Sequence, residues 1–314
     1  MNTAVLVLVL GSAVGHAAWN LLTRGQTDRA AFLLRSLIIV IVLGAVAVTA
    51  GEFFGDVFSR LTPTAWLCVG LAGLFGGLHY FFLAHSYDSA DFTTVYPVVR
   101  ALPIVLIAFG DAFRGREPTP LGWVGIMVVV AGCALSSMRS LRSIAWSHYF
   151  NRSSIWMALA ALGIVGYTIP DKIAAENMTP SGLASAVIYQ YLALLGCLIV
   201  FVAARMLLPM RVHGSSRLVG TGRVSEALGV SGVHRPVGWF KPAMAAALNF
   251  GSYGLILWAY QMVGRAGYVL AMRQFSIVIG VILAFAIFKE SGRIVRIAGA
   301  VLVTIGVIII KCGG

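Results

Sequence analysis

Two stretches of the sequence decide the fold. Residues 87–117 read YDSADFTTVYPVVRALPIVLIAFGDAFRGRE, and residues 260–290 read YQMVGRAGYVLAMRQFSIVIGVILAFAIFKE. A shift of 173 residues (260 minus 87) lays one stretch on the other without a gap and aligns Arg100 with Arg273. Each stretch also leaves its apolar run through a basic residue followed by Glu. An Arg at the same position of both apolar runs, and a basic–Glu pair at the end of each, predict that the chain contains an internal repeat.

The sequence around these stretches is apolar enough for a lipid environment. Of its 314 residues, 59% are hydrophobic and 11% are charged, whereas a soluble globular chain carries about 25% charged residues. Apolar windows of about twenty residues, long enough to cross a bilayer core of roughly 30 Å, recur along the chain. Backbone polar groups in lipid must be satisfied within the segment, and the period-two alternation of a barrel is absent, so we predict helices and an all-α integral membrane fold. The ten windows are 3–22, 30–50, 65–84, 92–109, 121–138, 155–173, 183–204, 242–263, 266–288 and 294–310.

The repeat and the number of spans together predict the architecture. We expect a first five-helix repeat at residues 1–138, a connector at 139–154, and a second repeat at 155–314 that contains a long polar loop at 205–241. Five is an odd number, so the two halves must enter the membrane in opposite directions. Inverted halves of this kind are typical of secondary transporters, which bind substrate at the repeat interface near the bilayer midplane.

Other function classes have less support in the sequence. The basic residues that give a net charge of +12 are scattered through short inter-span segments, a pattern that sets membrane orientation and does not indicate nucleic acid as a partner. The sequence has no GxxxxGK[ST] and no HExxH or other metal spacing, so we predict no metal, no cofactor and no enzyme. A membrane enzyme acting on lipid head-groups remains an alternative. Such an enzyme needs converging acids, and of eleven acids only Asp171 falls inside a predicted span.

Two short motifs add a family resemblance. The runs GHAAWNLLTRG at 15–25 and YPVVRALP at 96–103, with the ten spans and the basic–Glu exits, resemble EamA-type members of the drug/metabolite transporter superfamily. The resemblance covers essentially the whole chain. It implies inverted five-helix repeats, a central cavity lined mainly by spans 1, 3, 4, 6, 8 and 9, and rocking between inward-open and outward-open states. It does not fix the substrate, because the superfamily moves amino acids, sugars, nucleotide-sugars, drugs and other metabolites.

Arginines inside the spans are the first candidates for substrate binding, since intramembrane ionisable residues mark pathways or paired partners. Arg100 lies between Pro97 and Pro103, and Tyr96 shares its helical face. Arg273 is its counterpart in the repeat. Two guanidiniums related in this way could bind a carboxylate, phosphate or phosphonate bidentately. The alternative is that each Arg only bonds helix-end carbonyls or a neighbouring side chain.

Further polar residues are candidates for binding or coupling. His16 and Asn20 share a face of the first span, and histidine ordinarily titrates near physiological pH, so His16 could carry a proton or simply pack as a hydrogen-bonded histidine. Asp171 is the other candidate for proton coupling, or for pairing with a buried Arg. Lys172 beside it is expected to extend to the membrane interface or to pair with Asp171. The remaining predicted substrate-binding residues come from aromatic–polar sets that could equally make interhelical hydrogen bonds: His79, Asn249 and Tyr253.

These observations predict a secondary active transporter that exports a small polar metabolite, anionic or zwitterionic, by alternating access. Import or exchange of a similar solute is the alternative. We expect a multi-pass protein of the bacterial inner membrane, a monomer or homodimer in the lipid bilayer. Lys and Arg gather in the odd-numbered inter-span segments, so the positive-inside rule predicts both termini outside, whereas the family resemblance implies both inside.

Overall fold

The computed structural model describes residues 2–24, 26, 29–54, 59, 61–89, 92–138, 152–208, 238–288 and 293–314. Within these ranges the chain is helical, and an isolated bridge between Leu61 and Met178 is its only extended pairing. Nine of the ten predicted spans correspond to one helix each, and the remaining span corresponds to two. The helices are α1 (Thr3–Arg24), α2 (Arg29–Phe54), α3 (Pro63–Ser89), α4 (Phe92–Phe113), α5 (Pro120–Ser137), α6 (Arg152–Glu176), α7 (Leu183–Leu207), α9 (Phe240–Met262), α10 (Ala266–Arg273), α11 (Phe275–Phe288) and α12 (Arg293–Gly313).

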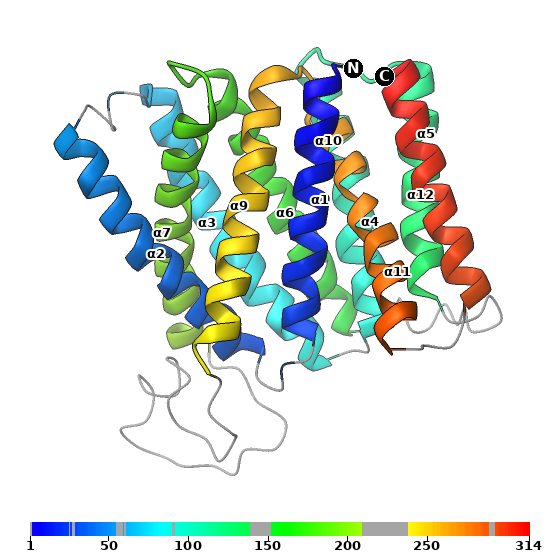
Figure 1. The fold of residues 1–314 in the computed structure, drawn as a ribbon, viewed down its shortest axis with the longest axis horizontal. Helices are drawn as coiled ribbons and strands as arrows, with labels where there is room; N and C mark the ends of the chain where they lie inside the picture. The colour runs from blue at the N-terminus through cyan, green and yellow to red at the C-terminus, as the bar shows by residue number, and fades with distance from the viewer. Residues whose placement is uncertain are drawn as a thin grey trace, which may run out of the picture.

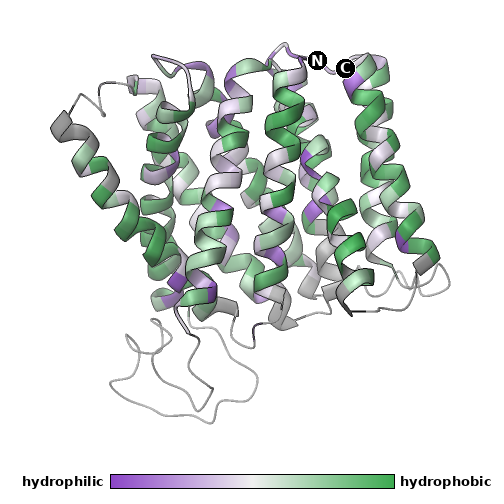
Figure 2. Cartoon of the chain, viewed as in Figure 1, coloured by the Kyte–Doolittle hydropathy of each residue, from purple (hydrophilic) through white to green (hydrophobic). Residues whose placement is uncertain are grey.

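The helices stand side by side in a single bundle (Figure 1). The first residues of α1 and the last residues of α12 lie at the same end of the bundle, which we call the terminal end. Apolar residues cover most of the length of the helices (Figure 2). In the described part of the chain, seven helical segments are long and apolar enough to cross a membrane by length and hydropathy. This multi-pass arrangement agrees with the predicted all-α membrane fold.

The predicted span 266–288 is broken, which corrects the expectation of one continuous helix. α10 ends at Arg273 and α11 begins at Phe275. Gln274 forms a tight turn between them, in which its backbone N–H donates to the Ala271 carbonyl at 3.1 Å and its own carbonyl accepts from Ile277 N–H at 2.8 Å. The sequence has no Gly or Pro at this turn, so hydropathy alone could not locate it. The break puts Arg273 and Gln274 at a helix end in the interior of the bundle.

Two predicted boundaries also move. α7 continues to Leu207 and α9 begins at Phe240, so both ends of the predicted loop 205–241 are helical or next to a helix, and residues 209–237 lie outside the described ranges. α4 continues to Phe113, beyond the predicted residue 109, and takes Asp111 into the helix. Asp111 is 2% exposed. The expectation that Asp171 is the only acid within a span is therefore wrong.

Glycines allow α5 and α12 to pack closely against each other. α5 packs along α12, and a β-carbon at Gly132 would lie 2.7 Å from the Gly299 carbonyl oxygen. A β-carbon at Gly306 would lie 2.8 Å from the Gly125 carbonyl oxygen. Helices in lipid gain no hydrophobic drive from each other, so small residues that allow close backbone approach stabilise their contact. The two C-terminal helices of the predicted halves therefore pack as one unit beside the site.

Candidate functional site

A central cavity of about 180 Å³ lies among α1, α3, α4, α6, α7, α9 and α10. It is smaller than the roughly 300–1,000 Å³ of drug-sized ligand sites and has room for a metabolite rather than a single water. The resemblance predicted six of these helices, and the structure adds α7. The polar and aromatic side chains that line the cavity are His16, Trp19, Asn20, His79, Tyr80, Arg100, Tyr167, Asp171, Tyr189, Gln190, Asn249, Tyr253, Arg273 and Gln274.

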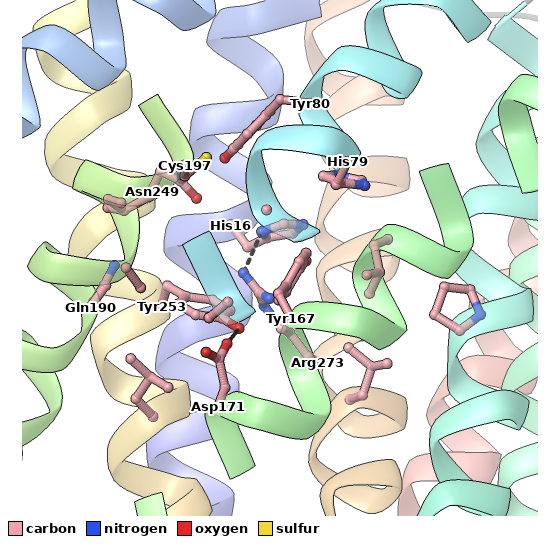
Figure 3. Close-up of a pocket in the computed structure, with 18 of the residues that line it drawn as sticks. His16, His79, Tyr80, Tyr167, Asp171, Gln190, Cys197, Asn249, Tyr253 and Arg273 are labelled. Atoms are coloured by element: carbon pink, nitrogen blue, oxygen red, sulfur yellow. Dashed lines mark hydrogen bonds between the residues drawn. The ribbon is translucent and has the colours of Figure 1, made fainter. Parts of the chain in front are cut away.

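The cavity brings together residues that the sequence analysis selected from distant parts of the chain. Seven of the eight predicted substrate-binding residues line it, as does Asp171, and Figure 3 shows most of them around one space. The exception is Tyr96, which lies in α4 and whose side chain falls outside the described part of the structure. The seven are His16, Asn20, His79, Arg100, Asn249, Tyr253 and Arg273.

Six of the polar and aromatic lining residues are not among the predicted site residues: Trp19, Tyr80, Tyr167, Tyr189, Gln190 and Gln274. Trp19 follows His16 by one helical turn, so the spacing of α1 carried a signal for it. Tyr167 lies one turn before Asp171 on α6 in the same way. Gln274 aligns with Ala101 in the repeat and could not be found from sequence, because its position depends on the unpredicted turn between α10 and α11.

Arg273 and His16 form the contact at the centre of the site. Arg273 Nη2 lies 2.9 Å from His16 Nδ1, and Trp19 Nε1 donates to the same Nδ1 at 3.0 Å. The Arg273 guanidinium also lies over the Tyr253 ring, 5.1 Å from its centroid, as a cation–π pair. Both Arg273 and His16 are 8% exposed. The cation is therefore held from two sides by neutral groups.

Arg100 lines the same cavity from α4. Its Nη1 donates to Gln274 Oε1 at 3.3 Å, and Gln274 directly follows Arg273. The two arginines that the repeat relates thus line one cavity, and one of them contacts the chain neighbour of the other. A concave site lined by two cations fits an anionic group better than a cationic one.

Asp171 is held by hydroxyl groups. Tyr189 OH donates to Asp171 Oδ1 at 2.8 Å, and Tyr253 OH donates to Oδ2. Asp171 is 2% exposed. Since Tyr253 also stacks on Arg273, the acid and the guanidinium are joined through one aromatic ring. Asp171 therefore faces the cavity and is connected to Arg273 through Tyr253.

Lys172, the next residue on α6, neither reaches the membrane interface nor pairs with Asp171, the two positions predicted for it. It is 1% exposed, so it does not extend to the membrane interface. Its Nζ donates to the Tyr260 carbonyl at 2.7 Å and to the Val263 carbonyl at 2.5 Å, and it pairs with Glu176 at 2.8 Å instead of with Asp171. Neighbouring helix residues point about 100° apart, which separates the two side chains. Lys172 thus caps the C-terminal carbonyls of α9, where the helix dipole favours a cation.

Asp111 makes the complementary contact on the next helix. Its Oδ2 accepts the Gly267 backbone N–H at 2.7 Å, at the first turn of α10, where the helix dipole favours an anion. An ion pair between Arg114 and Glu176 then joins the end of α4 to the end of α6. We call Asp111, Arg114, Lys172 and Glu176 the terminal-end clamp. It binds α4 and α6 to the connection between α9 and α10.

Comparison with known proteins assigns the first half of the chain. Residues 3–138 match the model of the EamA-like transporter family. These residues are an EamA-type domain. The EamA-type domain belongs to the drug/metabolite transporter superfamily, which confirms the resemblance for residues 3–138, and it contributes His16, His79 and Arg100 to the cavity. The family match covers residues 3–138, and the apolar helices of the described structure agree with a membrane protein.

Comparison with solved structures shows the fold of the whole chain around the EamA-type domain. Twenty-eight solved chains match. One is a crystal structure titled only "Crystal structure of protein", with a TM-score of 0.69 and 16% sequence identity over 99% of each chain. At this identity the likeness shows the fold alone. No curated protein matches the chain.

Proposed function

We propose that this protein is a secondary active transporter that exports a small polar metabolite with an anionic or zwitterionic group. The observation that carries the proposal is the pair Arg100 and Arg273, which align in the sequence repeat and line one small cavity. We propose a bacterial inner membrane as its setting, with the protein as a monomer or homodimer.

Alternating access requires two halves that can exchange roles, and several features support inverted repeats at residues 1–138 and 155–314. α1 starts at the terminal end, whereas α6 starts at the opposite end and α12 finishes at the terminal end (Figure 1). In the proposed repeat, α6 is the counterpart of α1, α9 is the counterpart of α3, and α12 is the counterpart of α5. The extensive contact between α1 and α9 therefore has its counterpart in the extensive contact between α6 and α3, and the contact between α5 and α12 is its own counterpart.

The terminal-end clamp supports an assignment of the conformation. It ties α4 and α6 to the α9–α10 connection on the side of Asp171 towards the terminal end. At the same end Thr119 N–H donates to Tyr268 OH at 2.9 Å, and Thr119 Oγ1 donates to the Gly313 carbonyl at 2.6 Å. We assign this conformation to the state of the cycle that is closed at the terminal end. In the alternate state these contacts must separate.

The proposed substrate contacts follow from the charges of the cavity. A carboxylate or phosphate on the solute would be bound from both sides, by Arg273 and by Arg100, since guanidiniums pair with such groups through parallel hydrogen bonds. Asn20, His79 and Asn249 would bind the rest of the solute, together with Tyr253 and Tyr96. We assign the coupling proton to Asp171 instead of His16, because His16 Nδ1 already faces two donors.

Transport by purified protein tests this proposal. A ligand-stabilisation screen with amino acids, organic acids and phosphorylated metabolites selects the solute, whose uptake is then measured in proteoliposomes. Arg273→Ala should abolish uptake while the protein stays folded. Arg265→Ala is the matched control, because Arg265 donates to the Glu117 carbonyl outside the cavity at 2.9 Å. Unaltered uptake by Arg273→Ala would overturn the anionic site, and turnover of lipid head-groups without solute flux would favour a membrane enzyme.

A further inference from the structure

The protonation state of His16 follows from its neighbours. Arg273 Nη2 and Trp19 Nε1 both lie within hydrogen-bond distance of His16 Nδ1, at 2.9 and 3.0 Å. Guanidinium and indole N–H groups are donors only. A ring nitrogen that faces two donors acts as an acceptor and carries no proton, so the imidazole is neutral and its proton is on Nε2.

Two donors of this pair remain without a partner in the described structure. These are His16 Nε2 and Arg273 Nε. Both side chains are more than nine-tenths buried, line the cavity and lie next to each other (Figure 3). Buried polar groups are nearly always hydrogen-bonded, so unpaired donors on two contacting side chains of the cavity indicate a ligand that supplies acceptors.

We propose that His16 Nε2–H and Arg273 Nε–H each donate to an oxygen of the anionic solute, and that Trp19 is the positioning residue that holds His16 in this donor form. This inference rests on the proposed function, because it takes the cavity as the substrate site. It gives His16 a specific role, which is to donate one fixed hydrogen bond. It also gives Trp19 a role through His16 that the sequence analysis did not assign.

The charges around His16 favour the same tautomer. α9, α10 and α11 pack against α1, and α11 carries no titratable side chain. The charged side chain in contact with His16 is Arg273 on α10, and the other charged residues that line the same cavity are Arg100 on α4 and Asp171 on α6. A second proton on Nδ1 of the imidazole would face the N–H groups of Arg273 and Trp19. Oxyanion binding should therefore change little over the pH range in which an ordinary histidine titrates.

Matched substitutions test the two ring nitrogens of His16 separately. His16→Gln keeps an N–H near the position of Nε2, whereas the shorter His16→Asn reaches only the position of Nδ1. Trp19→Phe keeps a ring beside His16 and removes only the donor. Trp66→Phe is its control, because Trp66 lies on α3 outside the cavity and is 42% exposed.

The first measurement is oxyanion binding by thermal stabilisation of the purified full-length protein. The probes are lactate, pyruvate and inorganic phosphate, with lactamide as the uncharged match to lactate. Wild type and His16→Gln should bind with Kd values within a few-fold, and His16→Asn at least tenfold more weakly, as expected for a lost hydrogen bond to a charged group. Stabilisation by lactate and pyruvate alone identifies a carboxylate, and stabilisation by phosphate alone identifies a phosphoryl group. Equal stabilisation by lactate and lactamide overturns the proposal.

The second measurement is ¹⁵N NMR of the histidine-labelled protein between pH 5.5 and 8. The His16 signal is assigned by its loss in His16→Asn. In wild type it should stay in the neutral Nε2–H form. In Trp19→Phe, which removes one of the two donors to Nδ1, the share of the neutral Nδ1–H form should rise and oxyanion binding should weaken. A wild-type His16 protonated on Nδ1 overturns the inference. Binding that survives His16→Asn overturns this inference alone, whereas a wild type that binds no oxyanion overturns the proposed substrate class as well.

Discussion

The terminal-end clamp allows a quantitative test with Lys172→Met. Methionine keeps an unbranched side chain of similar length and removes the charge and the donors. The substitution removes hydrogen bonds to the Tyr260 and Val263 carbonyls and the ion pair with Glu176. If the clamp forms only in the state closed at the terminal end, its loss shifts the protein towards the alternate state.

The size of the shift follows from these contacts. Hydrogen bonds to charged groups contribute about 1.5–3 kcal/mol each, and removing one partner of a buried ion pair costs about 3–5 kcal/mol when the other charge is left alone. Glu176 keeps Arg114 and its side chain is 27% exposed, so the lower end of that range applies. A loss of about 3 kcal/mol corresponds to a roughly hundredfold change in the open fraction.

Thiol labelling measures the open fraction. Cys68 is 3% exposed and lies on α3 one turn nearer the terminal end than Ala72, which lines the cavity. In a protein that keeps Cys68 as its only cysteine, Lys172→Met should raise the rate of labelling by a maleimide roughly a hundredfold. Lys241→Met, at an exposed lysine, is the control and should leave the rate unchanged.

Two outcomes would refute the reasoning. A Cys68 labelling rate within about threefold of wild type in Lys172→Met would mean that the contacts of Lys172 do not distinguish the two states. An equal rise in a protein that keeps only Cys133, which is fully buried on α5, would mean global unfolding instead of opening at one end.

Three further predictions concern coupling and packing. Asp171→Asn cannot carry a proton, so solute uptake driven by a pH gradient should be lost while solute exchange is retained; proteoliposome assays that find both unchanged would remove Asp171 from coupling. Asp111→Ala leaves the first turn of α10 without its acceptor and should destabilise the protein by about 1–3 kcal/mol, seen as a lower thermal midpoint. Gly306→Ala should also lower the midpoint, since its β-carbon would lie 2.8 Å from a backbone carbonyl of α5. Gly70→Ala, with nothing within 4 Å of its β-carbon, should not lower it.

The helices could be located from sequence because lipid leaves the backbone little choice. An apolar run long enough to cross the bilayer must satisfy its own hydrogen bonds, so the predicted windows lie close to the observed helices. The turn at Gln274 is the exception. It contains no helix-breaking residue, so no local signal marked the end of α10.

The cavity was predicted less completely than the helices. Charge and polarity inside a span were sufficient to select Arg100, Arg273 and His16, because such residues are expensive in lipid and so face the interior. The same rule could not say which interior contact each one makes. Asp111 was missed because the predicted end of its span lay at residue 109, two residues too early.

The adjacent residues Asp171 and Lys172 connect the cavity with the terminal-end clamp. Asp171 faces the cavity and accepts from Tyr253 on α9, while Lys172 bonds the carbonyls at the end of the same helix. Both follow Pro170, which lies inside α6 and cannot donate a hydrogen bond to the preceding turn. A change in this turn must move both contacts with α9 together, because one peptide bond joins the two residues. Protonation or binding at Asp171 and separation at Lys172 therefore act on the same short segment of α6.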